Sequence, residues 1–177
     1  MPFRDFDADR QEVSTLVART GDVEVHLMTW QDLPEVEALR RTNQQWLAEW
    51  VVDDATRKNT GALSFAVKLE GQIVGELTLW NVDRKSATMP PTLGYWIDQS
   101  HARRGIMKVA VAETLAYAHR ELALRRVLVP IAADNAASLA LARSLGLLKF
   151  GEARYNGVHA RHIVYAAERS DSADLQV

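Results

Sequence analysis

The chain has 177 residues and a net charge of −2, from 21 basic and 23 acidic side chains. This length suits one domain with its own hydrophobic core, and the balanced charge gives no overall field that would attract nucleic acid. The absence of cysteine excludes disulfides, thiolate metal sites and a cysteine nucleophile.

The two ends of the chain are polar, and the middle carries the apolar patterns of a domain. No apolar run reaches the roughly 18 residues of a membrane span, and the charged N-terminus lacks the apolar stretch of a signal peptide. We therefore expect a cytoplasmic protein that does not contact membranes. We interpret residues 1–21 as an N-terminal extension, residues 22–168 as the domain and residues 169–177 as a tail.

Apolar periodicity predicts a mixed α/β domain. Strands are predicted where apolar residues alternate or run together, and helices where they recur every three or four residues. In chain order these are a strand at 23–28, helices from Thr29 and at 43–50, strands at 63–68, 73–80 and 93–97, a helix at 106–121, a strand at 126–131, a helix from Asp134, and strands at 148–155 and 158–166. The helix at 106–121 is expected to be a parallel crossover after an antiparallel meander. Its predicted core face consists of Val109, Ala112, Leu115, Ala116 and His119.

A basic loop follows the strand at 93–97. It contains Arg103, Arg104 and Gly105, and Lys108 lies in the first turn of the next helix. A helix start presents unpaired N–H groups and about half a positive charge, and glycine lets the backbone approach an anion closely. The segment therefore fits a pyrophosphate, although a solvated loop that caps a helix gives the same pattern. No His, Asp or Glu cluster has metal-ligand spacing, so we expect no metal.

Five short segments stand in a characteristic order and spacing. They are LGYWI at 93–97, RRGI at 103–106, LALRRV at 122–127, DNAAS at 134–138 and LGL at 145–147. On these segments the chain resembles the GNAT superfamily of N-acetyltransferases, and most of all the branch that acetylates the N-terminal amine of ribosomal proteins. The resemblance implies an α/β fold with a splayed mixed sheet of about seven strands flanked by about four helices. It also implies an enzyme that transfers an acetyl group from acetyl-CoA to an amine.

By this resemblance, acetyl-CoA would lie between the strands at 93–97 and 126–131. The backbone of residues 96–98 would bind the pantetheine and polarise the acetyl carbonyl. The amides of residues 104–108 would hold the pyrophosphate, and Asn135 would reach the pantetheine arm. The cofactor-binding residues implied are Trp96, Ile97, Asp98, Arg103, Arg104, Gly105, Ile106, Met107, Lys108, Asn135 and Ser138.

The candidate catalytic residues are Ser138, Glu76 and Tyr95. By the resemblance, Ser138 would face the departing sulfur, where a hydroxyl that donates a proton or hydrogen bond lowers the barrier. Tyr95 would take that place if Ser138 does not, and Glu76 and Glu152 are candidate proton relays. The alternatives are structural: Ser138 packs, Asn135 caps a helix, Tyr95 lies in the core, and both glutamates are solvated surface residues.

Three positions depart from the family pattern. Ala102 and Met107 replace the residues usual in the pyrophosphate loop, and the long Met107 side chain would lie beside the phosphate groove and shield or narrow it. Thr92 stands where a general-base glutamate often precedes the strand. These departures leave a catalytically silent CoA-binding module as an alternative to an enzyme.

The acceptor is expected to be a weakly basic amine. An α-amine has a pKa near 8, so roughly a tenth is neutral at pH 7, whereas a lysine side chain, near 10.4, needs more help from a base. We therefore expect a protein N-terminus as the acceptor, in a groove formed by Trp46, Trp50 and Asn156, and a monomer or homodimer. A small amine, such as an antibiotic or an aminoacylated metabolite, is the alternative.

Overall fold

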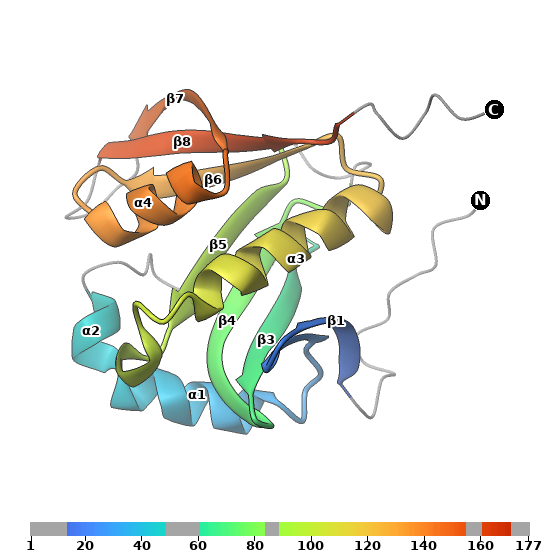
Figure 1. Cartoon of the computed structure of the whole chain (residues 1–177), viewed down its shortest axis with the longest axis vertical. Helices are drawn as coiled ribbons and strands as arrows, with labels where there is room; N and C mark the ends of the chain where they lie inside the picture. Colours follow the sequence, from blue (N-terminus) through green and yellow to red (C-terminus); the bar gives the residue numbers. More distant parts are fainter. Residues whose placement is uncertain (1–13, 49–60, 84–88, 155–160, 171–177) are drawn as a thin grey trace.

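The computed structural model describes residues 14–48, 61–83, 89–154 and 161–170. Within these ranges the chain forms one sheet of eight strands with four α-helices (Figure 1). The strands are β1 Thr15–Thr20, β2 Val23–Leu27, β3 Leu63–Leu69, β4 Gln72–Trp80, β5 Thr92–Ile97, β6 Arg126–Ala132, β7 Leu148–Arg154 and β8 Arg161–Glu168. The helices are α1 Leu33–Thr42, α2 Gln44–Ala48, α3 Ile106–Arg120 and α4 Ala136–Ser144, with a 3-10 helix at Gln99–His101.

The sheet is mixed, with its strands in the order β1-β2-β3-β4-β5-β6-β8-β7. All neighbouring strands are antiparallel except β5 and β6, because α3 carries the chain back to the same end of the sheet. In the described residues one pair, Thr92 with Leu128, joins β5 to β6, and the two strands then diverge (Figure 1). We call the separation beyond this pair the β5–β6 opening. It confirms the splayed mixed sheet expected from the sequence.

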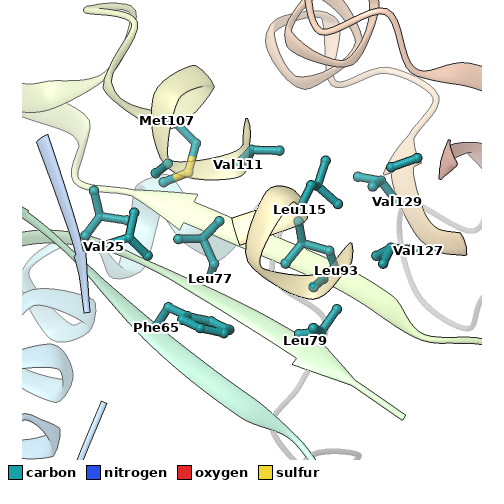
Figure 2. Packing of buried hydrophobic residues seen from close by; sticks show 14 of the residues in the cluster. Val25, Phe65, Leu77, Leu79, Leu93, Met107, Val111, Leu115, Val127 and Val129 are labelled. Carbon is teal, nitrogen blue, oxygen red and sulfur yellow. The ribbon is translucent and has the colours of Figure 1, made fainter. Parts of the chain in front are cut away.

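Helices cover both faces of the sheet. The larger apolar cluster lies between the sheet and α3 with α4, and a smaller one lies between the sheet and α1 with α2. Because both faces are covered, β4 is buried on successive residues instead of alternate ones. Figure 2 shows side chains of the larger cluster pointing toward one another between α3 and the strands: Val25, Phe65, Leu77, Leu79, Leu93, Met107, Val111, Leu115, Val127 and Val129.

The buried face of α3 differs from the predicted one. The predicted residues Val109, Ala112, Ala116 and His119 are only partly buried, and the buried face consists of Ile106, Met107, Ala110, Val111, Thr114, Leu115 and Ala118. Small residues at this face let the helix approach the sheet closely, which apolar periodicity alone does not show. The Met107 side chain is therefore in the core and not beside a phosphate groove. Its Cε lies 3.2 Å from the position that a Cβ on Gly75 would take.

Strand β1 corrects the interpretation of residues 1–21 as an extension outside the domain. β1 pairs antiparallel with β2, through a turn in which Gly21 has a φ of 59°. The side chains of β1 are exposed or half-buried, because it is an edge strand with one neighbour. This weak burial explains why the apolar pattern did not reveal it, and it raises the strand number from about seven to eight in the described residues.

Candidate active site

The backbone of β5 directs toward the β5–β6 opening hydrogen-bonding groups that have no partner among the described residues. Leu128 N–H donates to the Pro91 carbonyl at 2.8 Å, whereas Asp98 N–H donates to the Val74 carbonyl of β4 at 2.8 Å. Backbone groups alternate in direction along a strand. Odd-numbered residues of β5 therefore point toward β6 and even-numbered residues toward β4. Tyr95, which follows the last pairing with β6, directs its N–H and C=O into the opening.

The carboxyl end of β5 is closed by α2. The indole N–H of Trp46 donates to the Ile97 carbonyl at 3.1 Å. Residues 96–98 were expected to bind the pantetheine through their backbone. The Ile97 carbonyl and the Asp98 N–H instead form hydrogen bonds within the protein, and Trp96 pairs with Glu76 of β4. We correct that expectation: the groups that face the opening are those of Tyr95 and the N–H of Ile97.

The N-terminus of α3 lies directly after this end of β5 and is uncapped. Gly105 is the N-cap residue, with a φ of 79°, and no side chain in the described ranges caps the helix. The first intrahelical bond runs from Val109 N–H to the Gly105 carbonyl at 3.2 Å, which leaves the N–H groups of residues 106–108 unpaired among the described residues. A Cβ at Gly105 would meet no atom within 4 Å. An anion can therefore reach these N–H groups directly.

Three cations surround the helix start. Arg103, Arg104 and Lys108 are exposed, and none of them forms an ion pair with another residue in the described ranges. Arg103 has a φ of 63°, a conformation uncommon for a residue with a side chain. Two residues of this loop, Arg103 and Gly105, are thus left-handed, and the loop places three exposed cationic residues next to the start of α3 in the sequence.

A buried polar cluster anchors this loop to the helical corner between α1 and α2. Asn43 Nδ2 donates to Asp98 Oδ1 at 2.7 Å, and Asn43 Oδ1 accepts from Gln99 N–H at 2.9 Å. Asp98 Oδ2 accepts from the Ser100 hydroxyl and lies 2.7 Å from His101 Nδ1. Burial acts to raise the pKa of Asp98, but these hydrogen bonds outweigh it and hold the pKa below its ordinary value. Asp98 is thus an ionised loop anchor.

The first turn of α4 faces Tyr95 across the opening. Asn135 caps α4, its Oδ1 accepting from Ser138 N–H at 3.0 Å, and its NH2 group makes no hydrogen bond with the described residues. The Tyr95 hydroxyl is buried without a hydrogen bond of normal geometry. Burial raises the pKa of Tyr95 to about 12, and the nearby Ser138 hydroxyl opposes part of this rise. Two hydroxyls, one from each side of the opening, therefore lie together.

Glu76 is buried in a network on the opposite face of the sheet. Its carboxylate accepts from Arg40 Nε at 3.2 Å and Nη2 at 2.5 Å, from the Trp96 indole N–H at 3.0 Å and from the Thr78 hydroxyl at 3.2 Å. The Arg40 guanidinium also lies over the Trp96 ring, 5.3 Å from its centroid. Glu76 is therefore not the solvated surface residue that was the alternative interpretation. Its carboxylate oxygens already accept hydrogen bonds from neighbouring side chains, so it is not placed as a free base.

Glu152, the other candidate relay, is exposed on β7. It is paired with Arg161 at 2.9 Å and with Lys149 at 3.4 Å. The hydrogen bonds from Arg161 are the main cause that lowers the pKa of Glu152 to about 2. A carboxylate of this acidity is a poor proton acceptor. The remaining acceptor-groove residues, Trp50 and Asn156, lie outside the described residues.

Sequence reasoning missed Asn43 as a site residue. It stands between Leu39 and Leu47 at spacings of four, so a polar side chain interrupts the apolar face of a helical corner. A buried amide needs hydrogen-bond partners. The sequence pattern therefore predicts that Asn43 forms buried hydrogen bonds, but it does not identify Asp98 as a partner.

Other kinds of site are not seen in the described part of the chain. No group of three or more His, Asp or Glu side chains in it is placed to hold a metal ion, and no described helix is long and apolar enough to cross a membrane. A hollow of about 250 Å³ lies between β1, β2 and the end of α3, and shares no residue with the β5–β6 opening.

Comparisons with known proteins agree with this geometry. Residues 3–148 match the family model of the acetyltransferase (GNAT) domain. The chain is 25% identical over 166 residues to the putative ribosomal N-acetyltransferase YdaF of Bacillus subtilis, which covers 81% of this chain and 90% of YdaF.

Solved structures share the fold, and two of them serve as examples. The ribosomal-protein-S5-alanine acetyltransferase of Vibrio fischeri matches with a TM-score of 0.75 and 23% identity, over 90% of this chain and 98% of that one. RimL, a ribosomal L7/L12 α-N-protein acetyltransferase in complex with coenzyme A, matches with a TM-score of 0.73 and 20% identity, over 86% and 97% of the two chains.

Proposed function

Because the chain belongs to the acetyltransferase (GNAT) domain family, and is thus an acetyl-CoA-dependent N-acetyltransferase, we propose that its acceptor is the N-terminal α-amine of a protein, with ribosomal proteins as the substrate class. The observation that carries this proposal is the divergence of β5 from β6, with a helix start that no side chain caps in the described residues beyond the end of β5 and the neighbouring hydroxyls of Tyr95 and Ser138 beside it. The similarity to proteins named as ribosomal-protein acetyltransferases supports the acceptor class.

The residues around the opening fit acetyl-CoA along its length. The N–H groups of residues 106–108, with Arg103 and Arg104, bind the pyrophosphate by hydrogen bonds and charge. The inward backbone groups of Tyr95 and the N–H of Ile97 pair with the amides of the pantetheine arm, as a neighbouring strand would. The sulfur would then lie near the Ser138 hydroxyl, in the first turn of α4. The open space at Gly105 allows such a ligand to approach the loop closely.

The engaged carboxylates favour an α-amine as the acceptor. Glu76 and Glu152 are both held by cations, so neither is free to deprotonate a strongly basic amine. At pH 7 roughly a tenth of an α-amine is already neutral, against less than about 0.1% of a lysine side chain. The α-amine can therefore attack after passing its proton to water, whereas lysine would need a dedicated base.

A thiol-release assay tests this function. Acetyl-CoA is supplied with peptides that copy ribosomal-protein N-termini, the same peptides with blocked N-termini, and a panel of small amines. We expect turnover with the unblocked peptides alone. Turnover with small amines alone would identify a small-molecule acceptor instead, and CoA binding without any turnover would identify a silent CoA-binding module.

We expect Ser138→Ala to reduce kcat by roughly 10- to 100-fold with little change in CoA affinity, since a single positioned donor to the leaving group acts mainly as the C–S bond breaks. The free energy of unfolding should change by less than about 1 kcal/mol, because alanine is a better helix former than serine. Steady-state kinetics and calorimetry measure both effects. Wild-type kcat, with chemistry shown to be rate-limiting, would make Ser138 a packing residue.

We expect Asn135→Ala to raise the KM for acetyl-CoA more than it lowers kcat, since the side-chain NH2 contacts the cofactor before and during reaction. The alanine variant also loses the helix cap, at about 0.5–2 kcal/mol. Asn135→Asp is the matched control because it keeps the capping oxygen and removes the NH2 donor. Both variants should raise KM, and only the alanine variant should unfold more easily. A wild-type KM in Asn135→Asp would remove Asn135 from the cofactor site.

A further inference from the structure

The corner between α1 and α2 contacts each of the four residues 96–99, which end β5 and begin the loop before α3. The contacts are the Arg40 guanidinium over the Trp96 ring, the Trp46 indole N–H on the Ile97 carbonyl, and the Asn43 side chain on Asp98 and Gln99. Figure 1 shows this loop beside both helices. The hydrogen-bonded partners are 51 to 56 residues apart in the chain, so tertiary contacts from the corner hold the start of the loop.

Every polar atom of the Asn43 side chain is engaged. Its Nδ2 donates to Asp98 Oδ1 at 2.7 Å and to the Leu39 carbonyl at 2.9 Å, and its Oδ1 accepts from Gln99 N–H at 2.9 Å. Asn43 is only 4% exposed, so these bonds are sheltered from water, where hydrogen bonds are electrostatically stronger. Alanine could make none of the three bonds, and an ionised aspartate has no donor for two of them.

The loop that follows has a backbone that needs support. Arg103 has a φ of 63°, a conformation that a residue with a side chain seldom adopts and that persists where the surrounding structure enforces it. Directly before it, the N–H groups of residues 101 and 102 donate to the carbonyls of Asp98 and Gln99 at 3.0 and 3.2 Å, which forms the 3-10 turn. The turn is therefore built on the two residues that Asn43 holds.

We propose that Asn43 is a positioning residue for acetyl-CoA, which fixes the loop before α3 so that its cations and the N–H groups at the helix start can bind the pyrophosphate. This inference rests on the proposed function and adds that a side chain of the α1–α2 corner sets the affinity for the cofactor. Asn43 acts through Asp98 and Gln99 and does not touch the cofactor. A displaced loop would weaken several contacts at once, because hydrogen bonds weaken steeply with distance and angle.

Asn43→Ala tests this role by calorimetric titration with CoA and by steady-state kinetics. We expect the Kd for CoA and the KM for acetyl-CoA to rise about tenfold, while kcat at saturation falls less than about threefold, because bound cofactor restores the loop. Val36→Ala is the control, since it removes buried volume from the same helix and also destabilises the protein, but a valine side chain cannot hydrogen-bond the loop. We expect a lower thermal midpoint and wild-type CoA affinity in this control.

An exchange of the two side chains tests the contact itself. Asn43→Asp sets a second carboxylate against that of Asp98, and should weaken CoA binding more than Asn43→Ala does, because like charges repel. Adding Asp98→Asn restores a donor and an acceptor with their roles reversed, and the new amide oxygen can still accept from Ser100 and His101. We expect the double variant to bind CoA within about threefold of wild type, since contacting residues couple in this way. Its thermal midpoint should recover less, because the bond to the Leu39 carbonyl stays lost.

The outcomes separate the two proposals. Wild-type protein that fails to bind CoA overturns the proposed function and this inference together. Wild-type binding with unchanged CoA affinity in Asn43→Ala overturns this inference alone, and so does an equal loss of affinity in Val36→Ala, because lower stability would then explain both. If circular dichroism shows that Asn43→Ala does not fold, the exchange decides. A double variant that binds CoA more than about tenfold more weakly than wild type overturns the role of the contact.

Discussion

Replacing Gly105 with Asp is expected to abolish CoA binding, with a loss in affinity of roughly 100-fold or more, or about 2.7 kcal/mol. The change puts a negative charge beside the N–H groups that would receive the pyrophosphate, so that like charges repel. It also fills the space that is now open at Gly105. Isothermal titration calorimetry with CoA measures the effect.

Gly105→Asn is the matched control for this variant. Asn has nearly the same shape as Asp, tolerates the left-handed backbone that Gly105 adopts, and carries no charge. We expect it to bind CoA measurably, which separates charge from bulk and strain. Unchanged affinity in a folded Gly105→Asp variant would show that the pyrophosphate lies elsewhere.

Replacing Arg40 with Met is expected to lower the free energy of unfolding by about 2–4 kcal/mol. Breaking a buried pair by removing one partner costs about 3–5 kcal/mol, because the other charge stays buried, and the 21% exposure of the Arg40 side chain reduces this cost. Arg40→Met together with Glu76→Met should recover much of the loss, since no unpaired charge then remains. Denaturant titration followed by circular dichroism measures all three proteins.

Arg41 provides the control one residue along the same helix. Its pair with Glu37 spans 3.9 Å, and both side chains are about two-thirds exposed, so Arg41→Met should change stability by less than about 0.5 kcal/mol. If Arg40→Met lowers the free energy of unfolding no more than Arg41→Met does, then the Glu76 network does not stabilise the packing of α1 on the sheet. Glu76 would then again be a candidate proton relay.

The central strands and the glycine-containing loop before α3 could be predicted because local chemistry specifies them. The hairpin of β3 and β4 follows from two apolar runs around Gly71, which has the φ of 82° that a tight turn needs. The loop before α3 follows from its basic residues and Gly105. These features depend on neighbours in the sequence, so one sequence suffices to find them.

The features that were missed depend on partners distant in the sequence. The sequence alone predicts a free carboxylate at Glu76, but α1 brings Arg40 into hydrogen-bond contact with it. The sequence places Met107 beside a groove, but Gly75 on β4 leaves room for its side chain in the core. The sequence alone predicts that the Ile97 carbonyl can bind a ligand, but it already accepts a hydrogen bond from the Trp46 indole N–H. In each case tertiary packing decides the role of a side chain, and the residue type alone allows either role.

Acetylation of a peptide that carries both kinds of amine tests the account most directly. The peptide begins with alanine or serine and contains one internal lysine, and fragmentation mass spectrometry locates the acetyl group after incubation with the protein and acetyl-CoA. We expect the acetyl group on the α-amine, with Ser138→Ala and Gly105→Asp slowing its appearance. Acetylation of the lysine in preference to the α-amine would contradict the account, because the described site offers no free carboxylate at Glu76 or Glu152 to deprotonate it.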